Sequence, residues 1–98
     1  MAYQYTLHPA AQEDYESSVS WYLKRSVKAA SNFVQATENA FAYICDDPRR
    51  CRNEYKHYYE FNVRKYPFTI VYSIEESRQL IVIIAVYHQK RDPGGKYR

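Results

Sequence analysis

Two long stretches of the chain repeat their apolar residues with the period of an α-helix. The first begins at about Pro9, because proline is tolerated at a first helical position and acidic residues follow it, and it ends near residues 24–26. The second runs from Lys28 to Asp46, and Pro48 marks its end. These stretches predict a helical hairpin with a very short turn. Its inner faces would carry Ala11, Tyr15, Ser18, Val19 and Tyr22 with Trp21 at the edge, and Ala30, Phe33, Val34, Thr37, Phe41 and Ile44.

Elsewhere the apolar residues alternate with a period of two, as they do in half-buried strands. Residues 3–7 predict a short strand at or next to the centre of a sheet, with Tyr3, Tyr5 and Leu7 facing inward. Residues 58–64 and 68–74 predict two further strands, joined by a tight turn around residues 65–67. Residues 80–86 are apolar on both sides, so we expect the last strand to lie in the interior of the sheet.

The order strand, two helices, three strands predicts an α+β fold. The last three strands would form an antiparallel meander, and the first would most simply add beside the last. The result would be a four-stranded sheet with both helices on one face and the opposite face partly open. Candidate residues of this open face are Tyr58, Glu60, Asn62, Arg64, Thr69, Val71 and Ser73, with Tyr87 and His88 at the end of the last strand.

Composition narrows the class of protein. The 98 residues predict a single domain, 1–98, and no Ser/Gly tract indicates a linker. The apolar run at residues 80–86 is far too short to cross a membrane and the N-terminus lacks a leader pattern, so we expect a soluble, cytoplasmic protein with no membrane partner. Cys45 and Cys51 are too few for a disulfide framework, and their spacing with His57 matches no standard zinc pattern, which leaves zinc a minor alternative. We expect no metal and no cofactor.

Charge is unevenly distributed along the chain. Residues 1–48 hold three Lys or Arg and six Asp or Glu, a net −3, whereas residues 49–98 hold eleven and five, a net +6. A basic C-terminal half suits a nucleic acid, the ribosome or an acidic protein partner, and charge alone does not choose among them. The alternative is an ordinary solvated basic surface.

Tyrosine and histidine supply the candidate chemistry. Twelve tyrosines favour a protein-binding surface, because the ring of a tyrosine can be buried while its hydroxyl stays hydrated. Alternatively, several of these tyrosines simply cover the thin core of a small protein. His88 is the only histidine predicted at a strand end, beside Tyr87 and the basic residues 90–91. In such a setting histidine can act as general acid or base in RNA cleavage that needs no metal. Alternatively, His88 hydrogen-bonds across the sheet and fixes the C-terminal segment.

Four fragments of the chain resemble the RelE/ParE superfamily of toxins from type II toxin–antitoxin modules. They are the Leu-His-Pro-Ala-Ala sequence at residues 7–11 with Asp14 following, the Trp21-Tyr22 pair, the Tyr-Pro-Phe-x-Ile-x-Tyr strand at residues 66–72, and the closing residues 85–93. Their order and spacing extend the resemblance over almost the whole chain, from Tyr3 to Pro93.

The resemblance implies a toxin that a cognate antitoxin neutralises by wrapping a segment over it, with DNA contacted only through that complex. Members of the superfamily are either ribosome-dependent mRNA endonucleases or ParE-type poisons of DNA gyrase. The ribonuclease branch usually has an arginine where this chain has Thr69, and residues 67–72 resemble the ParE side more closely. We therefore expect a ParE-like inhibitor of gyrase. The alternatives are a ribosome-dependent endonuclease that cuts mRNA, and a degenerate member that binds only its antitoxin.

These considerations give two sets of candidate site residues. For a ribonuclease the expected catalytic residues are His88, Arg64, Arg91 and Tyr87, whereas a gyrase inhibitor needs none. Candidate residues for binding the target or the antitoxin are Trp21, Tyr22, Tyr58, Arg64, Lys65, Tyr87, His88, Lys90 and Arg91. The uneven charge predicts an acidic, amphipathic antitoxin segment with its apolar side chains against the helical hairpin or the sheet rim.

Overall fold

The computed structural model describes residues 3–90 of the chain and contains a long helical hairpin. Helices α1 (Pro9–Leu23) and α2 (Val27–Asp46) are joined by only three residues, which confirms the predicted hairpin and its short turn. At the start of α1, His8 Nδ1 accepts a hydrogen bond from the Ala10 N–H. At the start of α2, Ser26 Oγ accepts one from the Ala29 N–H at 2.9 Å. Both caps satisfy backbone donors that have no partner within their helix.

The sheet has five strands, in the order β1-β5-β4-β3-β2. Strands β2 (Arg52–Tyr55), β3 (Tyr58–Asn62), β4 (Phe68–Glu75) and β5 (Leu80–His88) are antiparallel to one another, and β1 (Gln4–Leu7) runs parallel beside β5. Short 3₁₀ turns occur at η1 (Pro48–Arg50) and η2 (Glu76–Arg78). The α+β class, the meander and the place of the first strand beside the last are all confirmed.

Two expectations about the sheet were wrong. Strand β2, which brings the sheet from four strands to five, escaped prediction because Arg-Asn-Glu-Tyr is polar and shows no apolar alternation; only pairing with β3 makes it a strand. Strand β1 lies at the edge of the sheet and not near its centre. It pairs with β5 on one side, and none of the described strands pairs with its other side. The inward orientation predicted for Tyr3 and Leu7 holds, since both pack on the core, whereas Tyr5 contacts Phe41 but stays 36% exposed.

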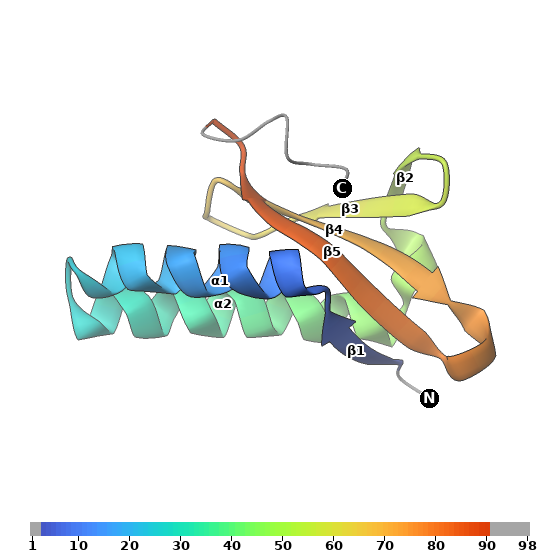
Figure 1. Ribbon diagram of the computed structural model, residues 1–98, viewed down its shortest axis with the longest axis horizontal. Coiled ribbons are helices and arrows are strands. Elements are labelled where there is room, and N and C mark those ends of the chain that lie inside the picture. Colours follow the sequence, from blue (N-terminus) through green and yellow to red (C-terminus); the bar gives the residue numbers. More distant parts are fainter. Residues whose placement is uncertain (1–2, 91–98) are drawn as a thin grey trace.

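Both helices cover one face of the sheet (Figure 1). The core between the layers is built from the α2 stripe that the helical period predicts, with Phe33, Phe41 and Ile44 fully buried. On the sheet side it contains the alternate residues Ile70 and Tyr72 of β4. Tyr72 is 0% exposed, and its hydroxyl donates a hydrogen bond to the Pro48 carbonyl at 2.6 Å. The core therefore joins α2, the sheet and η1 into one packed unit.

An extra residue in β5 reverses the alternation of that strand. Val71 pairs with Ala85 but Tyr72 pairs with Ile83, so Ile84 is inserted as a β-bulge. Before the bulge, Ile81 and Ile83 lie in the core under the helices; after it, Val86 lies there and Ala85 and Tyr87 cluster on the opposite face. The bulge thus decides which way every later side chain of β5 points.

Candidate functional site

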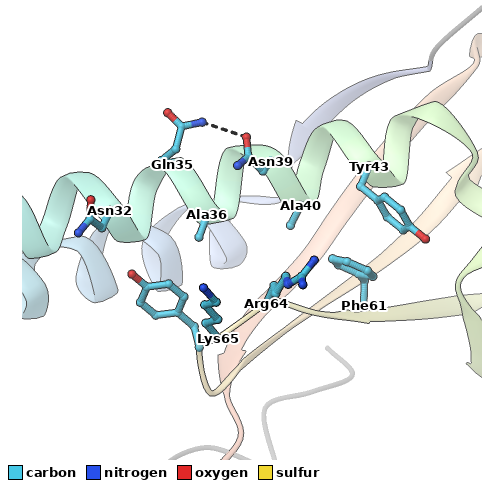
Figure 2. Close-up of a pocket in the computed structure, with 10 residues that line it drawn as sticks. Asn32, Gln35, Ala36, Asn39, Ala40, Tyr43, Phe61, Arg64 and Lys65 are labelled. Atoms are coloured by element: carbon cyan, nitrogen blue, oxygen red, sulfur yellow. Dashed lines mark hydrogen bonds between the residues drawn. The ribbon is translucent and has the colours of Figure 1, made fainter.

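A groove lies between α2 and the β3–β4 turn (Figure 2). Its volume is about 820 Å³. The groove is hollow because Ala36 and Ala40, one helical turn apart, present only methyl groups where larger side chains would fill the space. The remaining lining residues are Asn32, Gln35, Asn39 and Tyr43 from α2, and Phe61, Arg64, Lys65 and Tyr66 from the sheet side.

Aromatic rings mark the two ends of this α2 groove. At one end Tyr43 stacks on Phe61 with ring centroids 4.9 Å apart, and the Arg50 guanidinium lies 3.6 Å from the Tyr43 ring centroid. At the other end Tyr66 packs edge-on against Phe33 at 5.4 Å. Because these rings are already held by neighbours, an incoming side chain meets a preformed surface and little ordering cost is paid on binding.

The polar rims of the α2 groove carry amides on one side and cations on the other. Gln35 Nε2 donates to Asn39 Oδ1 at 2.9 Å along the helix, while Arg64 and Lys65 border the groove from the β3–β4 turn, as Figure 2 shows. Lys65 has φ 70°, in the left-handed region. None of the carboxylates whose side chains the structure describes lines the groove. Its chemistry suits a ligand with apolar side chains and acidic groups.

Arg64 was expected on the open face of the sheet, and that expectation was wrong. Strand β3 ends at Asn62, so the alternation that would have placed Arg64 beside Asn62 stops before it reaches that residue. The β3–β4 turn then brings Arg64 and Lys65 to the α2 groove. The sequence analysis missed most of the groove. The spacing of Ala36 and Ala40 beside the core stripe of α2 was the signal that could have revealed it.

The open face itself is less open than predicted. Glu60, Thr69 and Val71, expected to be displayed, are buried, with Glu60 only 4% exposed. Thr69 Oγ1 donates to Asn62 Oδ1 at 2.8 Å and accepts from Gln89 Nε2 at 3.1 Å, and an Arg52 nitrogen lies 3.6 Å from Glu60 Oε1. Polar side chains on adjacent strands therefore shield one another from solvent on this face. Tyr58 and Tyr87 do remain on this face, in a small apolar cluster with Val71 and Ala85.

His88 lies on the helix side, not on the open face with Tyr87. It pairs with Phe68 across the β4–β5 ladder, and their rings meet edge-on at 5.1 Å. The Lys90 backbone N–H donates to His88 Nδ1 at 3.1 Å. The β-bulge is the physical reason, because it shifts the phase of β5 by one residue.

A second, smaller hollow of about 240 Å³ lies beside His88. Glu13, Asp14, Ser17 and Ser18 of α1 line it opposite Phe68 and residues 86–88. In the part of the chain that the structure describes, no lysine or arginine lines this hollow. Of the two cations expected beside His88, Lys90 follows it in the turn and Arg91 lies outside the described residues, whereas the α1 side of the hollow presents two carboxylates and two hydroxyls.

The other predicted binding residues are spread over the molecule. Trp21 is exposed on α1, whereas Tyr22 is half-buried, with its ring stacked on Phe33 at 4.7 Å. Lys90 is exposed in the turn after β5. Arg91 lies outside the described residues. Cys45 and Cys51 are both free thiols, and among the side chains that the structure describes no three of His, Cys, Asp or Glu gather in an arrangement that could hold a metal ion.

Residues 5–93 match the family model of the ParE toxin of the type II toxin–antitoxin system parDE. The chain belongs to the ParE toxin family. It is therefore the toxin of a type II toxin–antitoxin module, and the RelE/ParE resemblance of the sequence is confirmed. No curated protein sequence matches this toxin closely enough to count as a relative.

Solved structures of related toxins share the fold of this ParE-family toxin. The RelBE2 toxin–antitoxin complex of Mycobacterium tuberculosis matches with a TM-score of 0.59 and 21% identity, over 90% of this chain and 99% of that one. A RelE mutant of E. coli in the free state matches with a TM-score of 0.64 and 14% identity, over 95% and 90%. The intact E. coli RelBE complex matches with a TM-score of 0.63 and 13% identity, over 92% of this chain and 100% of that one.

Across the described residues, no helix of the toxin has the length and apolar character needed to cross a membrane.

Proposed function

We propose that this toxin arrests growth by binding DNA gyrase in the cytoplasm, not by cutting RNA, and that an acidic antitoxin segment neutralises it. The observation that carries the proposal is the separation of the candidate ribonuclease residues. Tyr87 clusters on the open face, His88 packs against Phe68 on the helix side, and Arg64 borders the α2 groove.

This separation weighs against RNA cleavage for a geometric reason. General acid–base catalysis needs the acid, the base and the charge-stabilising cation within hydrogen-bond reach of one phosphate. Here the side chains of Tyr87 and His88 leave β5 on opposite faces of the sheet, and the hollow that both residues line presents carboxylates that would repel a phosphate. Thr69, at the position where ribonuclease members usually have arginine, is buried and bonded to Asn62 and Gln89. A protein that acts by binding alone needs no such constellation.

The α2 groove is the place we assign to the antitoxin. Its methyl floor and aromatic ends offer burial to apolar side chains, and Arg64 and Lys65 on its rim offer partners to carboxylates. An amphipathic segment with acidic residues along one edge satisfies both conditions. The toxin would then contact DNA only through its complex with the antitoxin. Charge pairs at the rim would mainly speed association, whereas the apolar contacts would hold the complex together.

The deciding experiment compares wild-type toxin with His88→Ala in two purified systems, supercoiling by DNA gyrase and ribosomal translation of a defined mRNA. We expect both proteins to inhibit supercoiling at the same concentration and neither to cut the message. Wild-type toxin that cuts mRNA on the ribosome, with cutting lost in His88→Ala, would refute the gyrase proposal in favour of an endonuclease.

Pulse-labelling in cells provides an independent readout of the same proposal. After induction without the antitoxin, DNA synthesis should stop before protein synthesis, and the cells should filament. Co-expression of the antitoxin should restore growth. Absence of any growth defect would point instead to a degenerate member that binds only its antitoxin.

A further inference from the structure

The turn of the helical hairpin carries an exposed apolar and basic surface that the α2 groove does not include. We define the hairpin tip as residues 21–28, at the end of the α1–α2 hairpin that projects beyond the sheet (Figure 1). Trp21 is 40% exposed, Leu23 52% and Val27 75%. The tip also carries three exposed cations, Lys24, Arg25 and Lys28.

Charge makes the hairpin tip distinct from its surroundings. No Asp or Glu occurs between residues 17 and 37, so the three cations of the acidic N-terminal half all lie in a stretch without a counter-charge in sequence. The partial positive charge of the α2 N-terminus and the partial negative charge of the α1 C-terminus meet at this turn and oppose one another, so the three cations set its sign. The surface therefore favours a partner that is acidic.

The Trp21 ring of the hairpin tip is held in place before any partner arrives. The Arg25 guanidinium lies 4.1 Å from the Trp21 ring centroid, and Trp21 packs edge-on against Tyr22 at 5.0 Å. Tyr22 in turn stacks on Phe33 of the core. The N–H groups of Arg25 and Ser26 both donate to the Tyr22 carbonyl, which closes the turn. Tryptophan and arginine are both enriched among the residues that contribute most to binding at protein interfaces.

The chemistry favours a protein partner over a nucleic acid or a membrane. Arg25 covers a face of Trp21 on which a base would otherwise stack, and the aliphatic Leu23 and Val27 have no part in binding a phosphate backbone. Three apolar side chains on one turn are also too few for stable attachment to a bilayer surface, which needs a larger apolar face. An acidic protein surface with an apolar pocket would contact all six exposed residues, the three apolar side chains and the three cations.

We infer that the hairpin tip is the surface with which this toxin binds its target, and that it docks on an acidic, partly apolar surface of DNA gyrase. This inference rests on the gyrase function proposed above. The hairpin tip shares no residue with the α2 groove, so binding of the target and binding of the antitoxin depend on different side chains.

The test uses the full-length toxin, purified gyrase and the antitoxin. Val27→Asp replaces the most exposed apolar side chain with a charge that the acidic target repels, while an acid at the first position of α2 suits the helix and preserves the fold. Trp21→Ala removes the proposed anchor. Ser77→Asp is the control, because it adds the same charge in the exposed β4–β5 connection, at the opposite end of the molecule (Figure 1).

We expect Val27→Asp and Trp21→Ala to raise the concentration needed for half-inhibition of supercoiling by about tenfold or more, the size typical of an interface anchor. Antitoxin affinity, measured by calorimetry, should stay within about twofold of wild type for all three variants, and Ser77→Asp should inhibit gyrase normally.

Four outcomes would overturn the inference. Full inhibition of gyrase by both tip variants would refute it while leaving the gyrase function intact, whereas failure of the wild-type toxin to inhibit gyrase would refute both. Loss of antitoxin binding with unchanged gyrase inhibition would assign the hairpin tip to the antitoxin. Unchanged gyrase inhibition, with binding of the wild-type toxin to phosphatidylglycerol vesicles that Val27→Asp abolishes, would assign it to a membrane.

Discussion

The buried Tyr72 hydroxyl gives the sharpest prediction about stability. Tyr72 is the last residue of the 66–72 sequence that resembles the toxin superfamily, so a functional role could be expected for it. In the structure its hydroxyl instead donates to the Pro48 carbonyl, and burial together with the neighbouring Cys51 thiol raises its pKa. The group therefore stays protonated and able to donate at neutral pH. We expect Tyr72→Phe to destabilise the toxin without affecting its binding to the antitoxin.

The size of the effect follows from what the substitution leaves behind. Phenylalanine keeps the ring and its packing, but the carbonyl of the buried Pro48 loses its donor in a place where water does not replace it easily. An unsatisfied buried acceptor costs about 1–3 kcal/mol. For a chain of this length each kcal/mol lowers the melting temperature by about 4–8 °C. We therefore expect a fall of about 8–16 °C at the middle of that range.

Circular dichroism during thermal and urea unfolding measures this change. The matched control is Tyr59→Phe, which removes a hydroxyl from the half-buried ring that stacks on Tyr72 at 5.5 Å. The control should change the free energy of unfolding by no more than about 0.5 kcal/mol, as surface-like substitutions usually do. Equal losses in the two variants, or a loss below about 0.5 kcal/mol in Tyr72→Phe, would show that the bond to Pro48 does not hold η1 against the sheet.

Two further predictions concern the α2 groove and pH. Ala36→Trp should fill the groove and weaken antitoxin binding by about tenfold or more, whereas Ala42→Trp, at an exposed position of α2 outside the groove, should not; equal calorimetric affinities would exclude the groove. Burial, with Glu38 adding to it, raises the pKa of Tyr15 to about 12, above the unfolded value of about 10, so the unfolded chain loses its proton first. Stability should hold below pH 10 and fall towards pH 12, less steeply in Tyr15→Phe; a constant melting temperature across this range would contradict the burial argument.

The elements that the sequence predicted well are those whose apolar pattern has a clear phase. The 3.6-residue period of α2 located Phe33, Phe41 and Ile44 in the core, and Pro9 and Pro48 placed the start of α1 and the end of α2 within a few residues. Alternation in residues 58–64 and 68–74 likewise located the strands β3 and β4. In these segments one face must be buried, and the hydrophobicity of the side chains alone indicates which face it is.

The candidate site was predicted less well, because its geometry depends on contacts between segments. The Trp21-Tyr22 pair was found from sequence, but nothing along the chain distinguished the exposed Trp21 from Tyr22, whose ring is held by Phe33. Arg64 and Lys65 were predicted as binding residues, and the structure adds the groove that they border. The groove itself consists of space between α2 and a turn, which no local pattern encodes.

The sequence by itself determined the fold class, both helices and the family, since each depends on patterns that are local or on residue types in a fixed order. Tertiary structure alone decided the pairing of β2, the edge position of β1 and the bulge at Ile84. Residues 80–86 are apolar on both sides, so their hydrophobicity does not indicate which side chains face the helices. Only the pairing with β4 decides this. For that physical reason, Tyr87 and His88, neighbours in sequence, point their side chains to opposite faces of the sheet.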